Sequence, residues 1–302
     1  MNILYQILVI FFLVFMLASS AYLLWKQWAE QRIALRVVYT LSIFSYGALL
    51  VQVLINNVSM SAEAPYIKNG GFDHFVYVFL LLLLMAFLIL NNDNLKENAD
   101  PVYKSYFVIS VLQQFVLYSW FFTETGFVLA EALPMHVSRL SSIIGLFYLA
   151  TRNKKLLNVH FYFAIFAMLP FFVMAAINGF DHILGWSFFI NHCITLSIPF
   201  LGYYATGWLP DKRSIHQAYF YFIIYLIAAH FTNQLTGGNY FYLTDRPIAF
   251  LNDWPYVVYI ITVLIAIYAL FWLGYALFNG FVKFSRKYCE KDLVAKAKPD
   301  QN

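Results

Sequence analysis

The sequence predicts an all-α, polytopic membrane protein, a bundle of about nine transmembrane helices. Of its 302 residues, 62% are hydrophobic and only 11% are charged, whereas soluble globular chains carry roughly 25% charged residues. Apolar segments of about 20 residues, the length that a helix needs to cross the hydrocarbon core, recur along the chain. No polar stretch is long enough to form a separate soluble domain. We therefore expect membrane lipids as partners and no nucleic acid, and the sequence identifies no protein partner.

Two N-terminal helices are expected to precede a core of seven. The first apolar run lacks a basic region before it and is too long for the apolar part of a signal peptide, so we interpret it as an uncleaved helix. The fifth helix begins with Pro134, which suits a first helical turn because the N–H that proline lacks has no partner there. In order, the predicted helices are 3–25, 34–56, 73–91, 102–122, 134–150, 157–177, 187–206, 217–236 and 255–280.

The basic residues predict the orientation of the bundle. All of the 19 lysines and arginines except Lys68, Arg139 and Arg246 fall in one set of alternate connections or in the C-terminal tail. Connections on the cytoplasmic side of a membrane carry this excess. We therefore expect the N-terminus outside and the C-terminus inside, which is consistent with nine spans.

This topology divides the chain into three parts. They are an N-terminal transmembrane hairpin over 1–60, a seven-helix core over 73–280 and a basic cytoplasmic tail over 281–302. Cys193 lies in a membrane segment and Cys289 in the tail, at opposite faces. The distance between these faces excludes an intramolecular disulfide.

Four ionisable residues lie inside otherwise apolar segments: His136, Arg139, His192 and His230. Polar groups in hydrocarbon are costly and usually mark a site that faces the interior of the bundle. The predicted topology places all four near the outer face. Of the seven histidines, only His160 and His216 are expected at the inner face. A site that opens outward is the simplest interpretation.

The spacing of these residues indicates which helix faces they share. His136 and Arg139 are three positions apart, as are His230 and Asn233, so each pair is expected on one helix face. A histidine exchanges a proton near neutral pH, which suits general acid–base catalysis. Arg139, one turn inside the outer boundary, lies at headgroup depth and could hold a phosphate or carboxylate through two hydrogen bonds.

Each of these features also has a purely structural interpretation. An intramembrane histidine often bonds a neighbouring helix, and an arginine can extend its head group to the membrane surface. Asp181 and His182 fall in a loop and are expected to be solvated. Gly237 and Gly238 follow the eighth helix, where a glycine commonly ends a helix in a left-handed conformation.

Two motifs give the chain a family resemblance. At Leu133-Pro134-Met135-His136 and at Gly238-Asn239-Tyr240-Phe241-Tyr242-Leu243 with Pro247, it resembles the YwaF-like bacterial integral membrane proteins, which are related to eukaryotic transmembrane protein 164. Trp254-Pro255-Tyr256 is similar to a further motif of that family. The resemblance covers 73–280 and makes the first two helices look like an addition. It implies a multi-pass protein of the bacterial cell membrane, and His192 matches a histidine of the family pattern.

The resemblance also implies a chemistry. The eukaryotic relatives are implicated in acyl transfer between phospholipids, and many relatives carry a cysteine two residues after the motif histidine. This chain has Ser138 there. A serine nucleophile needs an adjacent base more than a cysteine does. His192 or His230 could supply it, whereas His136, two residues before Ser138, would point to another face.

The main hypothesis is therefore an outer-leaflet lipid acyltransferase, transacylase or lipid hydrolase without a cofactor or metal ion. Asn233 or Asn239 would stabilise the oxyanion. The candidate catalytic residues are His136, Ser138, His192 and His230, and the candidate substrate-binding residues are Arg139, Asn233, Asn239, Tyr240 and Arg246.

Three other functions stay open at this point, so the sequence does not decide whether the protein is an enzyme. One is a transporter or lipid-handling protein without chemistry, although the sequence shows no polar line that continues to the inner face. Another is a zinc-dependent hydrolase using three histidines and Asp181, although no paired histidine spacing supports it. The last is an assembly protein of the cell envelope, in which the polar residues only join helices.

Overall fold

The computed structural model of this chain describes residues 3–29, 64–90, 92–172 and 177–296, with a few residues between 36 and 54. Within these residues the secondary structure is helical, apart from one isolated β-bridge between Tyr66 and Asn178. The predicted all-α class is therefore confirmed. The predicted second helix, 34–56, lies largely outside the described residues.

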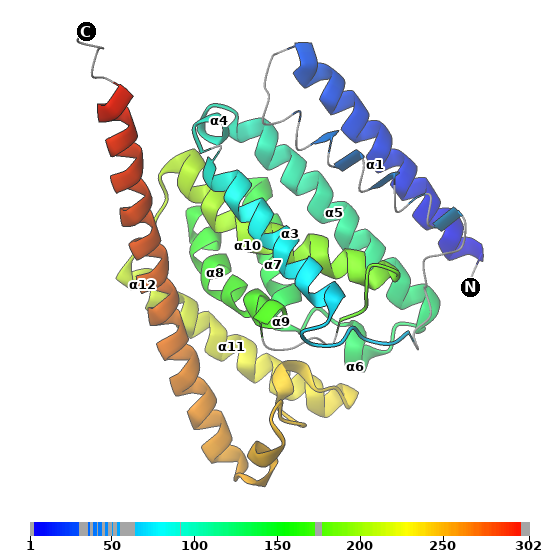
Figure 1. Cartoon of the computed structure of the whole chain (residues 1–302). Coiled ribbons are helices and arrows are strands. Elements are labelled where there is room, and N and C mark those ends of the chain that lie inside the picture. Colours follow the sequence, from blue (N-terminus) through cyan, green and yellow to red (C-terminus); the bar gives the residue numbers. More distant parts are fainter. Residues whose placement is uncertain are drawn as a thin grey trace.

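The helices follow the predicted order along the chain (Figure 1). The shorter connecting helices are α4 (Asn92–Glu97), α6 (Leu129–Ala132), α9 (Leu169–Phe172), η1 (Ile165–Met168), η2 (Tyr240–Tyr242) and η3 (Ala249–Asp253). The longer helices are α1 (Ile3–Ala29), α3 (Phe72–Leu90), α5 (Ala99–Glu124), α7 (Val137–Thr151), α8 (Lys154–Ala164), α10 (Ile183–Thr206), α11 (Lys212–Thr236) and α12 (Tyr256–Lys296).

Five of the described helices are long and apolar enough to cross a membrane: α1, α3, α5, α10 and α12. Helix α7 is apolar but has only 15 residues. Helix α11 has 25 residues, and its first turns contain Lys212, Arg213 and His216. The count of nine spans and the orientation of the chain stay predictions.

Helix α10 lies at the centre of the bundle (Figure 1) and contacts α3, α4, α5, α7 and α8. Helix α1 packs on α5, and α11 packs on α8 and α12. Small residues let these helices approach closely, as is common in membrane bundles. At Gly202 of α10, an added Cβ would lie only 2.6 Å from the side chain of Leu157 in α8.

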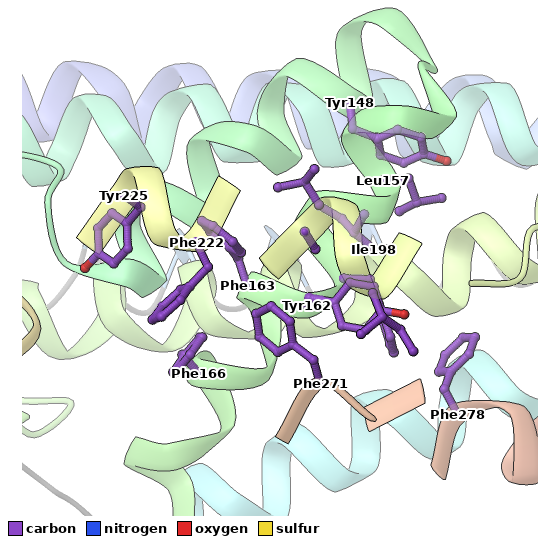
Figure 2. Close-up of a cluster of buried hydrophobic side chains, with 14 of the residues drawn as sticks. Tyr148, Leu157, Tyr162, Phe163, Phe166, Ile198, Phe222, Tyr225, Phe271 and Phe278 are labelled. Carbon is purple, nitrogen blue, oxygen red and sulfur yellow. The ribbon is translucent and has the colours of Figure 1, made fainter. Parts of the chain in front are cut away.

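Aromatic side chains fill the space between α8, α11 and α12 (Figure 2). Phe163, Phe222 and Phe271 are fully buried, and the ring of Phe166 stacks on that of Phe222 with centroids 5.7 Å apart. Lipid tails are as apolar as these rings, so burial from water supplies little attraction between helices inside a bilayer. Close packing and dispersion forces therefore hold this core together.

The start of α7 differs from the sequence prediction. The helix begins at Val137 rather than at Pro134, which lies in the preceding turn. Leu133 is extended because the ring of a following proline disfavours helical backbone at that position. His136 is consequently the extended N-cap residue of α7. The prediction that His136 and Arg139 share a helix face is wrong, because His136 precedes the helix.

Four further findings bear on the predicted helices and the connections between them. The predicted helix 157–177 is divided into α8, η1 and α9, close to Pro170, which lacks the N–H that a continuous helix would use. Helix α12 continues to Lys296, into the predicted basic tail. His182 is 2% exposed rather than solvated, and its Nδ1 accepts a hydrogen bond from the N–H of Leu184, so it caps α10. Gly237 ends α11 in the left-handed conformation, as predicted.

Gly145→Ala should destabilise the protein by about 1–3 kcal/mol, the usual cost of overpacking a close-packed site. The added Cβ would lie 2.7 Å from Cε1 of His160 and 2.9 Å from Cδ1 of Ile198. Gly280→Ala in α12 is the matched control, because nothing lies within 4 Å of its added Cβ. Thermal unfolding of the purified protein in detergent should show a lower midpoint for Gly145→Ala only. Equal midpoints would contradict the close approach.

Candidate active site

Polar side chains from three helices meet where α5, α7 and α10 pack together. We call this set the polar layer: Gln113 and Gln114 of α5, Ser142 of α7, and Ser187 and Asn191 of α10. The amide nitrogen of Gln114 donates to Oγ of Ser142 at 3.0 Å and to Oδ1 of Asn191 at 3.4 Å. That of Gln113 donates to Oγ of Ser187 at 2.8 Å. Hydrogen bonds therefore join the three helices inside an apolar bundle.

His192 lies beside the polar layer on α10 and is 4% exposed. Its Nδ1 is 2.8 Å from the carbonyl oxygen of Phe188, and because a carbonyl only accepts, Nδ1 carries the hydrogen. The ring also stacks on Phe188, with centroids 3.8 Å apart. The other nitrogen, Nε2, is buried and has no hydrogen-bond partner in the described part of the chain. In the neutral ring this nitrogen holds a lone pair that can accept a proton.

His74 of α3 shows the opposite arrangement. The N–H of Gly70 donates to Nδ1 of His74 at 3.0 Å, so this nitrogen holds the lone pair. In the neutral ring the hydrogen is then on Nε2. The lone pair of His74 thus accepts from a turn, whereas that of His192 has no donor among the described residues; Nε2 of both rings is buried without a hydrogen-bond partner there.

Arg139 lies in the first turn of α7. Its Nη1 donates to the carbonyl oxygen of Glu131 at 2.6 Å, and its guanidinium lies 4.8 Å from the centre of the Phe121 ring. These contacts fix the position of the cation. A guanidinium has five N–H donors, so this single bond leaves capacity for an anionic ligand.

Ser138, the second residue of α7, is half-buried. Helical spacing places it on the same face as Ser141, Ser142 and Gly145, which follow it by three, four and seven positions. This face meets the interior, because Ser142 bonds Gln114 and Gly145 packs against α8 and α10. Ser138 therefore lies one turn beyond the polar layer, toward the N-terminal end of α7.

The two sequence motifs meet at Tyr240. The hydroxyl of Tyr240 donates to the carbonyl of Leu129 at 2.6 Å and accepts from the N–H of Leu133 at 3.1 Å. Burial raises the pKa of Tyr240, which keeps the hydroxyl neutral and able to do both. The ring of His136 packs edge-on against that of Tyr240, with centroids 5.0 Å apart. His136 is thus held at the start of α7.

Asn233 and Asn239 use their side-chain amides to shape the loop after α11. Asn233 donates to the carbonyl of Tyr240 at 2.9 Å and accepts from its N–H at 2.8 Å. Oδ1 of Asn239 accepts from the N–H groups of Thr244 and Asp245, and its Nδ2 donates to the carbonyl of Asp245. The amides that were predicted as oxyanion donors therefore already have partners within the chain.

Arg246 and His230 lie toward α12 rather than in the polar layer. Nη1 of Arg246 donates to the carbonyl groups of Leu251 and Trp254, and its guanidinium covers the Tyr259 ring. Nδ1 of His230 lies 2.7 Å from the hydroxyl of Tyr256, the first residue of α12. The structure does not bring His230 together with His192.

Sequence reasoning missed His160, which was expected at the inner face. It is fully buried, with Nε2 2.9 Å from the carbonyl oxygen of Thr195 and Nδ1 2.8 Å from that of Ser141. Pro199 lies four residues after Thr195 and has no N–H to bond that carbonyl. The interior proline of the seventh predicted helix was therefore a signal that a polar partner was needed at this level.

Buried polar contacts also continue to the opposite end of the bundle. The hydroxyls of Tyr103 and Tyr148 lie 2.6 Å apart, and those of Tyr162 and Ser214 lie 3.2 Å apart. The sequence showed no such polar line, because these side chains lie on four different segments and periodicity does not say which of them meet. In the described ranges, no group of three His, Cys, Asp or Glu side chains is placed to hold a metal ion.

The apolar helices and the buried polar layer define a multi-pass α-helical membrane protein. The sequence profile of the TMEM164 family matches residues 70–275, which include α3, the polar layer, His192 and the loop around Tyr240. The chain therefore belongs to the TMEM164 family. Helix α1 lies outside the matched residues. Comparison with curated proteins and with solved structures gave no significant match.

Tyr240→Phe should lower the free energy of unfolding by about 1–3 kcal/mol, because it leaves the part-buried carbonyl of Leu129 and N–H of Leu133 without this partner. Tyr242→Phe is the control: Tyr242 is 40% exposed. Thermal unfolding in detergent compares the two variants. A Tyr240→Phe protein as stable as the control would contradict the bridging role of this hydroxyl.

Proposed function

We propose that this protein is a membrane-embedded enzyme that transfers or hydrolyses the acyl chains of membrane lipids. The observation that supports this most directly is the hydrogen bonding of the His192 ring. Its Nδ1–H is fixed on a backbone carbonyl, while its buried Nε2 has no partner among the described residues. An imidazole oriented in this way by one nitrogen is prepared to take a proton at the other.

Ser138 is the proposed nucleophile, since it lies on the face of α7 that meets α10. The family resemblance supports this position, because many relatives carry a cysteine there. As Oγ of Ser138 attacks the ester carbonyl carbon of a lipid, its proton moves to Nε2 of His192. The tetrahedral intermediate collapses, the ester C–O bond breaks, and the leaving lysolipid oxygen takes the proton from His192. An acyl-serine ester remains.

The second half of the reaction decides the product. The hydroxyl of a second lipid, in acyl transfer, or of water, in hydrolysis, attacks the acyl-serine carbonyl and gives its proton to Nε2 of His192. The bond to Oγ then breaks, and Ser138 recovers its proton from His192. The same base therefore serves both halves, as in other hydroxyl nucleophiles.

The first turn of α7 is the proposed oxyanion site. The first N–H groups of a helix have no partner within the helix, and the N-cap residue His136 makes no side-chain bond to them. They are available to a negatively charged oxygen that forms next to Ser138. Arg139, in the same turn, would bind the phosphate of the lipid headgroup. His136 and Tyr240 would line the opening through which the lipid reaches Ser138.

We further propose that this site faces the outer leaflet of a bacterial cell membrane, in a nine-span YwaF-like protein. The supporting observation is the charge pattern: Lys155 and Arg213 line one cleft, next to Lys154 and Lys212 in the first turns of α8 and α11, and α8 follows the C-terminal end of α7, whereas Arg139 lies in the first turn of α7. Cytoplasmic connections carry this excess of basic residues.

His192→Gln and Ser138→Ala should each lower acyl turnover by about 10²–10⁴-fold, the typical contribution of a positioned acid–base group. Proteoliposomes with an isotope-labelled phospholipid and an acceptor lysolipid allow both transfer and hydrolysis to be measured by mass spectrometry. His74→Gln and Ser119→Ala are matched controls, because Ser119 only donates to Val116 of its own helix. Ser138→Cys should retain turnover.

Full turnover in a folded His192→Gln protein would exclude this mechanism. Movement of lipid between leaflets with unchanged acyl chains would instead favour the transporter or lipid-handling function. The polar contacts that continue toward the opposite end of the bundle are the observation that favours that alternative.

Arg139→Gln should raise KM for a phospholipid by about 10- to 100-fold, because a charge-assisted hydrogen bond contributes roughly 1.5–3 kcal/mol. KM for a neutral diacylglycerol should change little, since that substrate has no phosphate. Arg139→Lys keeps the charge but loses the two-pronged geometry, so an intermediate KM is expected. Equal effects on both substrates would show that Arg139 has only a structural role.

A further inference from the structure

A second candidate site lies at the opposite end of the bundle from His192. It is a cleft of about 760 Å³ between the first turns of α8 and α11. We infer that this cleft binds the phosphodiester headgroup of an anionic glycerophospholipid, whose acyl chains lie along α11. Its lining includes Lys155, Asn158, Asp211, Arg213, Gln217 and Phe220.

The walls of the cleft are fixed by two contacts. Trp208, in the turn between α10 and α11, donates through its indole N–H to Oδ1 of Asn158 at 2.9 Å. The hydroxyls of Tyr162 and Ser214, which lines the cleft, lie 3.2 Å apart and join α8 to α11. These contacts thus fix the shape of the cleft between α8 and α11.

The charges in the cleft complement a headgroup with one negative charge. Lys155 and Arg213 are exposed, and neither forms an ion pair within the described residues. Oδ1 of Asp211 accepts the N–H of Ser214 at 2.7 Å, so this carboxylate caps α11 and stays in place. Lys155, Arg213 and Asp211 together carry a formal charge of one positive unit, and the ring of His216 also lines the cleft. Asp211, Asn158 and Gln217 offer acceptors to the hydroxyls of a polyol headgroup such as glycerol.

An apolar track leaves the cleft along α11. The exposed side chains follow helical spacing and so lie on one face of the helix; they are Phe220, Ile224, Ile227, Phe231 and Leu235. The track begins at Phe220, which itself lines the cleft. A basic cleft that continues into an exposed apolar helix face has the two-part shape of a phospholipid. A soluble phosphate compound would use the cleft and leave the track uncovered.

The test compares two double variants with the same change in charge. Lys155→Gln with Arg213→Gln removes the cations of the cleft, whereas Lys154→Gln with Lys212→Gln removes their exposed neighbours, which do not line it. Native mass spectrometry of the purified proteins, titrated with phosphatidylglycerol or phosphatidylcholine in detergent, measures the bound lipid. The cleft variant should lose about 30-fold in affinity for phosphatidylglycerol, from roughly 1 kcal/mol per basic residue.

The control variant should bind phosphatidylglycerol like the wild type, and phosphatidylcholine should bind weakly to all three proteins. Equal losses in both variants, or equal binding of both lipids, would overturn the proposal. Displacement of the lipid by millimolar inorganic phosphate would identify a soluble phosphate ligand instead and would also overturn it. The readout is binding and needs no turnover, so its result is independent of the proposed catalysis at His192.

Discussion

The packing of the bundle depends on the hydrogen bond that one backbone carbonyl of α10, that of Thr195, makes to a side chain of another helix. Hydrocarbon offers no hydrogen bonds, so a polar backbone group freed inside a membrane bundle must bond within the protein. Pro199 frees the carbonyl of Thr195, and His160 bonds it from α8. Gly145 lets His160 approach α7 closely enough to do so. This contact joins the three central helices, and the polar layer lies about one turn above it along α10.

The candidate site lies between these central helices and the turn before α7, which hydrogen bonds hold in place. Tyr240 connects the turn before α7 to the loop after α11, and Asn233 holds that loop in place. The residues that the sequence motifs emphasise are therefore largely those that position α7. The chemistry proposed for the site uses Ser138, two residues after the first motif, and His192, which matches the histidine of the family pattern. Family motifs in such a protein describe the frame of the site as much as its reactive groups.

Much of the fold could be predicted from the sequence. In a membrane chain, the lengths of the apolar segments and the locations of the basic residues determine where helices form almost independently of tertiary packing. The site was harder, since periodicity gives the face of a residue on its own helix but not the neighbour that the face meets. His192 and Arg139 were found because they are rare in apolar segments. Gln113 and Gln114 were missed because they were not considered beside the ionisable residues. Pro134 did not mark the start of α7, since a proline suits the turn before a helix as well as its first turn.

The short length of α7 has a consequence for what can reach Ser138. Its 15 residues rise about 22 Å, whereas the hydrocarbon core of a bilayer is about 30 Å thick. With Arg152, at its C-terminal end, level with one interface, the opposite end of α7 lies about 8 Å below the other interface. That depth lies inside the hydrocarbon core, below the phosphates and the glycerol esters, so the lipid must sit deeper than its neighbours, or the bilayer must thin locally, for its phosphate to meet Arg139 and its ester to meet Ser138. Local membrane thickness would then set the distance between a lipid ester and Ser138 in the proposed reaction, without any change of residue.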